Sequence, residues 1–499
     1  MKTLRYITLS LCWPLLSAAA TPADSAYVER QSLWRLTVSE ALQNPALMTH
    51  AYQKPFTELR LDADYRRQSE AFCMEEGTGY LLPEVAAQSY IRLTPSSVVW
   101  GKAAYSYGKQ YDKRYNNVAD FDLLYPDVIA DSLGGDTHRE RYFFSGGYAA
   151  EKDRWLLGGE LRFRAEQEYR TYDPRMRSIV SDLVLKAGAA RVVRNYSVGI
   201  SAEGNIYRQT ADVDFYGETN GMGELQMTGL GTSYVRFSGS NRDIFYEGKG
   251  GALVLDILPT AACGWTAHLS HALHQYERLS DEYNSLPLTT LYRQQTGLTV
   301  GWKQQGTKNE KALLLQASYD KRSSDEHVVG SASGQVYPIL TDLTMYRQQR
   351  WDVGIAAIYG HREWHLLMRG GVLSHRESYA YVERKMEYAR LYGELTAQWL
   401  KAVGSDLRLN LYGTGGYAGR ISDKLVMPYA NMTESIKDYV NHKHQFQKAS
   451  YTHAEAGVRT DYRPASWSVG VFGQLASRWL FCSEHENEGN LHLSLGIIF

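Results

Sequence analysis

Several features that would assign this chain of 499 residues to a familiar class are missing or scarce. Its 54 basic residues balance 55 acidic ones, so no basic excess favours nucleic-acid binding. One of the four cysteines, Cys12, lies in an N-terminal segment that we expect to be cleaved off. The three that remain cannot form a fully paired disulfide framework. No zinc-type cysteine pair, Walker loop or nucleophile elbow is present, so we expect neither an enzyme nor a cofactor site.

Long apolar runs are also missing, apart from one near the N-terminus. Lys2 and Arg5 precede an apolar stretch over residues 7–16, and small residues follow up to Ala20. This layout predicts a cleaved secretory signal peptide over residues 1–20. The stretch is about half the roughly 20 residues that a spanning helix needs, so we do not expect a helical membrane protein.

What the chain does contain is apolar and polar alternation with a period of two, from about residue 56 to its end. Over residues 154–169, Trp155, Leu157 and Leu161 alternate with Glu160 and Arg162. Such segments run to ten residues or more, whereas a tilted membrane strand needs about 9–11 residues and globular strands have about five or six. Short turns alternate with long polar loops, which is typical of outer-membrane barrels.

These segments predict an all-β fold, a closed antiparallel transmembrane β-barrel over residues 56–499. The strand number should be even, roughly 14–18. We expect long loops over 112–140, 211–242, 323–340 and 420–445, and a candidate loop hairpin over 233–237. The eighteen candidate strands, of which the first two are weak, lie near residues 56–66, 86–93, 97–111, 140–150, 154–170, 178–193, 195–210, 243–256, 263–277, 291–303, 309–322, 343–360, 363–379, 384–400, 405–419, 447–463, 466–481 and 489–499.

The two ends of the mature chain differ in character. The last segment places Leu491, Leu493 and Leu495 on one face and stops at Phe499, which resembles the terminal strand that barrels present to their assembly machinery. We therefore expect that machinery and outer-membrane lipid as partners, and the cell outer membrane as location. Residues 21–55 do not fit the strand pattern. They predict an arm with a short helix over 39–47, placed either in the periplasm or, as a small hatch, in the barrel mouth.

The mature chain resembles the uncharacterised outer-membrane barrels of anaerobic Gram-negative bacteria. Asn44-Pro45-Ala46, just before the first strand, is similar to the Asn-Pro-Ala of the long-chain fatty-acid transporter barrels. That resemblance implies that Asn44, Pro45 and Ala46 belong to an N-terminal hatch inside or beneath the lumen. A helix end followed by a turn explains the same tripeptide.

Charged residues lie on the strand faces opposite the apolar ones, and a charge facing lipid at mid-membrane is costly. We therefore expect them to face inward, either as a substrate path or as cross-strand ion pairs that fill the lumen. Their mixed signs argue against strong ion selectivity. The lumen-lining candidates are Lys102, Glu160, Arg162, Arg164, Glu166, Glu168, Lys186, Glu203, Arg390, Glu394, Arg408 and Arg478.

Histidines and cysteines supply two further expectations. His268 and His274 share a strand face but lie roughly 20 Å apart, and His271 points the other way, so we expect no metal site there. Cys73 falls in the first outer loop and Cys482 in the last. Because the first and last strands of a closed barrel are neighbours, a Cys73–Cys482 disulfide is a hypothesis for an oxidising compartment.

Two functions remain open from the residues alone. The first is a channel or transporter for small or hydrophobic nutrients. The alternative is a non-conducting barrel that anchors or assists a surface, uptake or secretion complex together with partner proteins. A lumen blocked by side chains and by the arm would favour the second, and single-channel conductance would separate the two.

Overall fold

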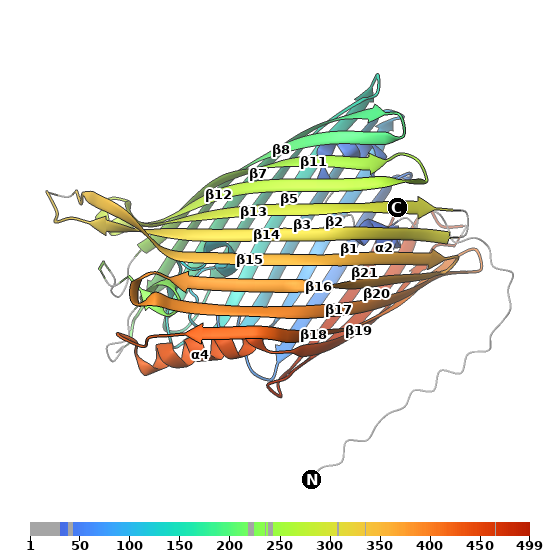
Figure 1. Cartoon of the computed structure of the whole chain (residues 1–499). Coiled ribbons are helices and arrows are strands. Elements are labelled where there is room, and N and C mark those ends of the chain that lie inside the picture. The colour runs from blue at the N-terminus through green and yellow to red at the C-terminus, as the bar shows by residue number, and fades with distance from the viewer. Residues whose placement is uncertain are drawn as a thin grey trace, which may run out of the picture.

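The computed structural model describes residues 30–37, 43–217, 224–234, 236–237, 243–306, 309–334, 336–464 and 466–499. The expected signal peptide lies outside these residues. Eighteen antiparallel strands form one closed sheet, in which β1 pairs with β21 (Figure 1). The strands of the barrel are β1 (Phe56–Gln68), β2 (Gly79–Thr94), β3 (Ser97–Lys113), β5 (Gly135–Lys152), β6 (Trp155–Tyr169), β7 (Arg175–Val193), β8 (Tyr196–Asp214), β11 (Asp243–Pro259), β12 (Cys263–Ser280), β13 (Leu286–Gln305), β14 (Asn309–Val329), β15 (Ile339–His361), β16 (Trp364–Tyr379), β17 (Arg384–Val403), β18 (Leu407–Val426), β19 (Tyr451–Tyr462), β20 (Gly470–Cys482) and β21 (Asn487–Ile498).

The remaining described elements are short and lie at the two ends of the barrel. They are α2 (Leu33–Thr37), η2 (Pro45–His50), α3 (Phe121–Leu124), β4 (Ile129–Ala130), β9 (Leu225–Gly229), β10 (Thr232–Ser233), η3 (Asp281–Tyr283), η4 (Tyr381–Glu383) and α4 (Glu434–Lys448). No helix in the described part of the chain is long and apolar enough to cross a membrane.

The predicted fold class is confirmed, and every one of the eighteen candidate segments overlaps one strand of the barrel. The strands are longer than expected at the loop end. Half of the loop expected over 323–340 is strand, because β14 and β15 continue to pair with each other out to Val329 and Ile339. Polar residues pair there as well as apolar ones do, since the backbone supplies the hydrogen bonds.

Two other expectations about the loops change. The expected loop over 420–445 contains the end of β18 and most of α4. The candidate hairpin over 233–237 lies earlier in the chain, where β9 pairs with β10 and also with β4 to form a small three-stranded sheet. The helix expected over 39–47 is a 3-10 helix over Pro45–His50 as far as the described residues go.

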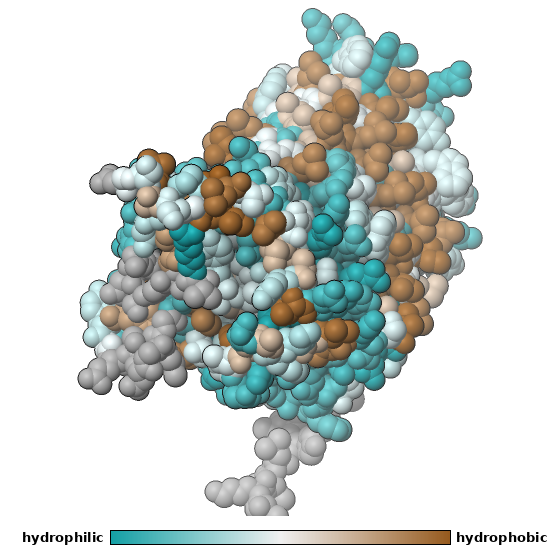
Figure 2. Space-filling view, turned by 60° about the vertical axis from the view of Figure 1, so that its left-hand side comes forward, coloured by the Kyte–Doolittle hydropathy of each residue, from teal (hydrophilic) through white to brown (hydrophobic). Residues whose placement is uncertain are grey.

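The two faces of the barrel wall differ as the alternation predicts. Large apolar side chains such as Leu157 and Leu161 are 57% and 46% exposed on the outside. Their neighbours along the same strand face the lumen. Figure 2 shows apolar side chains gathered along the wall. Tyr319 and Trp351 pack 4.1 Å apart toward the loop end, and Trp364 and Trp399 5.8 Å apart at the turn end, as aromatic side chains do at both membrane interfaces.

The connections at the two ends of the barrel are unequal. One end carries short turns, such as the one between β5 and β6, together with the start of β1 and the end of β21. The other end carries the long loops and α4 (Figure 1). Short periplasmic turns and long extracellular loops are the rule for such barrels, so the loop end faces outward from the cell.

Candidate functional site

The charged inner faces are largely paired within the wall. The structure places all twelve lumen-lining candidates on the face opposite the exposed apolar side chains. Lys186 Nζ lies 2.9 Å from Glu203 Oε2 on the neighbouring strand, where the two residues are register partners. Glu394 Oε2 lies 3.2 Å from His453 Nε2. These contacts fit the interpretation that ion pairs fill the lumen better than that of an open charged path.

The other candidates have similar partners. Their contacts are Lys102 with Glu84, Glu160 with Arg162, Arg164 with Glu166, Glu166 with Arg139, Glu168 with Lys113, Arg390 with the carbonyls of Phe446 and Gln447, and Arg408 with the carbonyl of Ser405. Arg478 is the register partner of Glu455 on β19.

The N-terminal arm enters the turn end of the barrel. Asn44 caps η2: its side chain accepts a hydrogen bond from the Ala46 amide at 3.1 Å. Its Nδ2 donates to Asp256 Oδ2 on β11 at 2.9 Å, and His268 Nδ1 lies 2.7 Å from the other oxygen of that carboxylate. Asp256 and Ala46 are both fully buried. The described residues around Asn44 therefore contact the inner wall of the barrel at this end.

Glycines on the inner wall make room for this segment. A Cβ added at Gly158 would lie 2.4 Å from the Pro45 carbonyl group, and one at Gly188 would lie 2.3 Å from Asn44 Oδ1. Both distances are below any tolerable contact, so the backbone of the arm lies directly against the glycine backbone of β6 and β7. We call Gly158 and Gly188 the glycine seat.

The earlier part of the arm lies against the opposite wall. Leu33 packs on Leu314 and Ile358. The Gln31 carbonyl and side chain accept hydrogen bonds from Gln398 and Asn410. β6 and β17, which contact the two parts of the arm, are nine strands apart in either direction around the closed sheet. The two described parts of the arm, residues 30–37 and 43–55, therefore lie against opposite walls at the turn end of the barrel.

A second segment crosses the lumen from the loop end. Residues 114–134, between β3 and β5, fold inward, and we call them the inward loop. Arg164 on β6 binds both carboxylate oxygens of Asp120, at 2.8 and 2.6 Å. Arg322 on β14 donates to the Asp122 carbonyl at 2.7 Å, and Tyr125 donates to Glu377 on β16 at 2.8 Å. Because these strands lie on different sides of the barrel, the inward loop crosses its interior.

Helix α4 and the loop between β1 and β2 cover the inward loop. Glu75, 1% exposed, accepts from Tyr439 at 2.5 Å and lies 3.2 Å from Lys443 Nζ. Burial raises the pKa of Glu75, but the Lys443 ammonium and the hydrogen bonds of Tyr439 and Cys73 outweigh it, and the pKa is lowered. Burial acts to lower the pKa of Lys443, and the neighbouring carboxylates hold it well above its usual value. The pair is therefore charged.

Sequence reasoning missed the groups that hold the arm and the inward loop, the two segments that close the lumen. Among them are Glu75, Asp120, Asp122, Lys443 and Asp256. One signal was present: the expected loop over 112–140 contains Phe121-Asp122-Leu123-Leu124-Tyr125, which is too apolar for a solvated loop. That composition favours a loop that packs inside the barrel.

A polar cavity of about 600 Å³ lies along the inward loop. Five cations and five carboxylates share its wall with apolar side chains such as Phe121 and Leu123, so the wall is mixed and its charged groups balance. Its ionisable lining residues are Arg66, Glu75, Glu76, Lys113, Asp120, Asp122, Arg139, Arg164, Asp182 and Arg293, besides Tyr80. Within the described residues, no group of three or more histidine, cysteine, aspartate or glutamate side chains is placed to hold a metal ion.

The hypothesis of a Cys73–Cys482 disulfide is wrong for this structure, in which Cys73, Cys263 and Cys482 are all free. The strands β1 and β21 are neighbours as expected. Cys73, however, turns inward and donates from Sγ to Glu75 Oε2 at 3.1 Å. Cys482 lies at the end of β20, where its backbone register partner is Tyr451 on β19.

A closed eighteen-stranded barrel with an apolar outer wall and a polar interior defines an outer-membrane β-barrel of Gram-negative bacteria. The chain belongs to the family of unknown function DUF6850, whose model matches residues 45–499. No curated protein matches the chain.

Several solved structures are similar to it. The ferric preacinetobactin receptor BauA of Acinetobacter baumannii is 11% identical, over 89% of this chain and 80% of that chain, with a TM-score of 0.44. The copper transporter OprC is 10% identical, over 85% and 62%, with a TM-score of 0.41. The siderophore receptor PiuA of A. baumannii is 6% identical, over 90% and 82%, with a TM-score of 0.39. TM-scores this low carry no argument about function.

Proposed function

We propose that the protein is a gated outer-membrane transporter for small polar nutrients. The single observation that carries this proposal is the polar cavity along the inward loop, in a lumen with the arm at one end and the inward loop at the other. Charged side chains line the cavity, so a polar cargo fits it better than a hydrophobic one. Of the small or hydrophobic nutrients expected from the sequence, the proposal keeps the small ones.

The arm is the hatch in this proposal. Asn44, Pro45 and Ala46 rest on the glycine seat, and one side-chain hydrogen bond to Asp256 ties them to the wall. A partner protein of an uptake complex, acting from the periplasm, would displace the arm and so open the lumen. The twelve lumen-lining residues would then present alternating charges to a cargo that passes between them.

A second function is favoured by one observation. Both the arm and the inward loop contact the inner wall, and the inner charges are largely paired with each other. A barrel that never opens would show the same features. It would anchor or assist a surface, uptake or secretion complex without conducting.

Planar bilayers distinguish the two functions. We expect the whole protein to show little conductance, and a variant lacking residues 30–52 to show defined conductance steps. Vesicles that contain the shortened variant should also swell in an amino acid or a small sugar. Steady large steps from the whole protein would contradict the gate. A folded but silent shortened variant would support the non-conducting barrel instead.

A further inference from the structure

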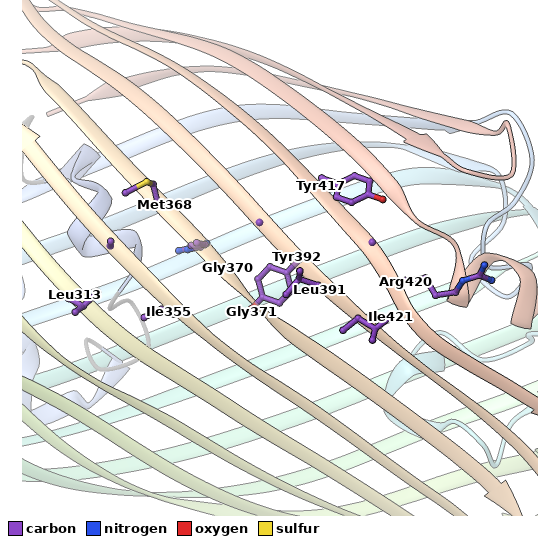
Figure 3. Close-up of a pocket in the computed structure, with 14 residues that line it drawn as sticks. Leu313, Ile355, Met368, Gly370, Gly371, Leu391, Tyr392, Tyr417, Arg420 and Ile421 are labelled. Carbon is purple, nitrogen blue, oxygen red and sulfur yellow. The ribbon is translucent and has the colours of Figure 1, made fainter.

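The outer wall of the barrel is hollowed across β14 to β18. Six large apolar side chains surround a groove of about 940 Å³ (Figure 3). These side chains are each 55–58% exposed. The six residues are Leu313, Ile355, Met368, Leu391, Tyr417 and Ile421. Since these side chains alternate with inward-facing ones, the groove opens toward the membrane and not toward the lumen.

Two paired glycines form the floor of the groove. Gly370 on β16 and Gly393 on β17 are direct register partners. A Cβ added at Gly393 would meet no atom within 4 Å, so the space above it is open. At the far side the ring of Tyr417 lies across Gly419, where a Cβ would come within 2.9 Å of it. The groove is therefore a gap left by missing side chains in an otherwise apolar wall.

A polar depression of about 410 Å³ continues from the groove toward the loop end on the same strands. Along β16 the outward positions run from Gly370 through Val372 and Ser374 to Arg376. The six steps from Gly370 to Arg376 span about 20 Å at roughly 3.3 Å per residue. Trp351, which lines the depression, marks the membrane interface there.

Two cations, Arg376 and Lys424, and two carboxylates, Glu387 and Asp423, line the depression, and Asp423 also contacts His444 and Lys448 of α4. Arg376, with a side chain that is 63% exposed, lies 2.9 Å from Glu387, and the exposed Lys424 is the register partner of the same glutamate. Two outward cations therefore share one carboxylate. Exposed arginine and lysine side chains at this depth suit a phosphate group that sits just above the acyl region.

We propose that the groove and the depression together bind one phosphorylated lipid of the outer leaflet, of lipid A chemistry. An acyl chain lies in the groove over Gly370 and Gly393, and a phosphate contacts Arg376 and Lys424. The order of the two parts matches the orientation of the barrel, because the polar part lies toward the extracellular loops. The proposal does not depend on whether the lumen conducts.

Native mass spectrometry of the purified whole protein, titrated with lipid A in detergent, tests the site. Gly393→Leu places a side chain in the groove at a position where an added Cβ meets no atom within 4 Å, and Arg376→Glu with Lys424→Glu reverses the charge at the surface. Each change should weaken the binding of the first lipid A by about tenfold or more, the equivalent of about 1.4 kcal/mol. Lipid A without its phosphates should bind the original protein more weakly than lipid A does. The charge-reversed variant and the original protein should bind this dephosphorylated lipid equally well.

Gly204→Leu is the matched control, because Gly204 on β8 also has no atom within 4 Å of an added Cβ and lies on another part of the wall. It should bind lipid A as the original protein does. Equal binding by all variants would overturn the proposal. Equal loss in the control would do so too, since it would mean that lipid A only coats the whole wall. Heat-modifiable migration confirms that each variant is folded.

Discussion

The two closures of the lumen are built by different means. At the turn end, the arm rests on glycine backbone, with small apolar clusters and a few hydrogen bonds around it. At the loop end, the inward loop and α4 share one large apolar cluster that includes Val118, Leu124 and Val440. Buried ion pairs such as Glu75–Lys443 reinforce it. Thus the arm lies on the inner wall of the barrel, whereas the inward loop is part of the apolar core.

This difference indicates which closure can move. Each net hydrogen bond that holds the arm contributes about 0.5–1.5 kcal/mol. Leaving one buried charge without its partner costs about 3–5 kcal/mol. Displacing the arm would open three small apolar clusters, whereas displacing the inward loop would open the one large cluster. We therefore propose that the arm is the moving part, and the following changes test that proposal from the largest effect to the smallest.

The largest effect is expected for Lys443→Met. It leaves the Glu75 carboxylate buried without its cation, at a cost of about 3–5 kcal/mol, so α4 should detach from the inward loop. Limited proteolysis of whole cells should then cut the chain near α4. Lys437→Met is the matched control, because Lys437 pairs with an exposed glutamate on the same helix and should change almost nothing.

A smaller effect is expected for Gly188→Leu, which occupies the place of the Asn44 side chain. Overpacking of this kind costs about 1–3 kcal/mol, which is enough to displace the arm but not to unfold the barrel. Conductance in planar bilayers should appear, while Gly204→Leu should stay silent. If the arm remained in place by hydrogen exchange, the glycine seat would not be what holds it.

The inward loop should respond to pH through Asp127. Burial raises the pKa of Asp127 to about 7, against about 3.9 in a solvated loop. The docked inward loop therefore keeps its full stability below pH 4 and loses part of it as the pH rises through 7. The equilibrium constant for docking falls by at most about tenfold per pH unit. Hydrogen exchange over residues 114–134, corrected for the intrinsic pH effect, should be slower at pH 5 than at pH 8. Asp127→Asn should remove that difference, and an unchanged difference would contradict this cause.

The smallest effect is expected for Asn44→Ala. It removes the bond to Asp256 and the cap of η2, each worth about 1 kcal/mol. The arm should spend more time displaced, which would appear as brief conductance events and not as steady steps. Steady steps of the size seen with Gly188→Leu would mean that this hydrogen bond, and not the glycine seat, decides the closure.

The barrel itself was predictable from local pattern. A strand repeats every two residues, and lipid tolerates only apolar side chains, so Leu157, Leu161 and Glu160 reveal their faces without any partner being known. Strand ends were less predictable. The pairing of β14 with β15 beyond the membrane depends on the backbone and leaves no apolar alternation in residues 323–327.

The closures were decided only by the tertiary structure. Asn44-Pro45-Ala46 marks a turn in the sequence, yet its burial depends on Gly158 and Gly188, which are far away in the chain. Arg164 appears in the sequence as one more inward charge, and only the fold brings Asp120 to it. Alternation determines which way a side chain faces because the strand backbone imposes it. What that side chain meets across the lumen depends on how loops and arm fold into a space that only the closed barrel creates.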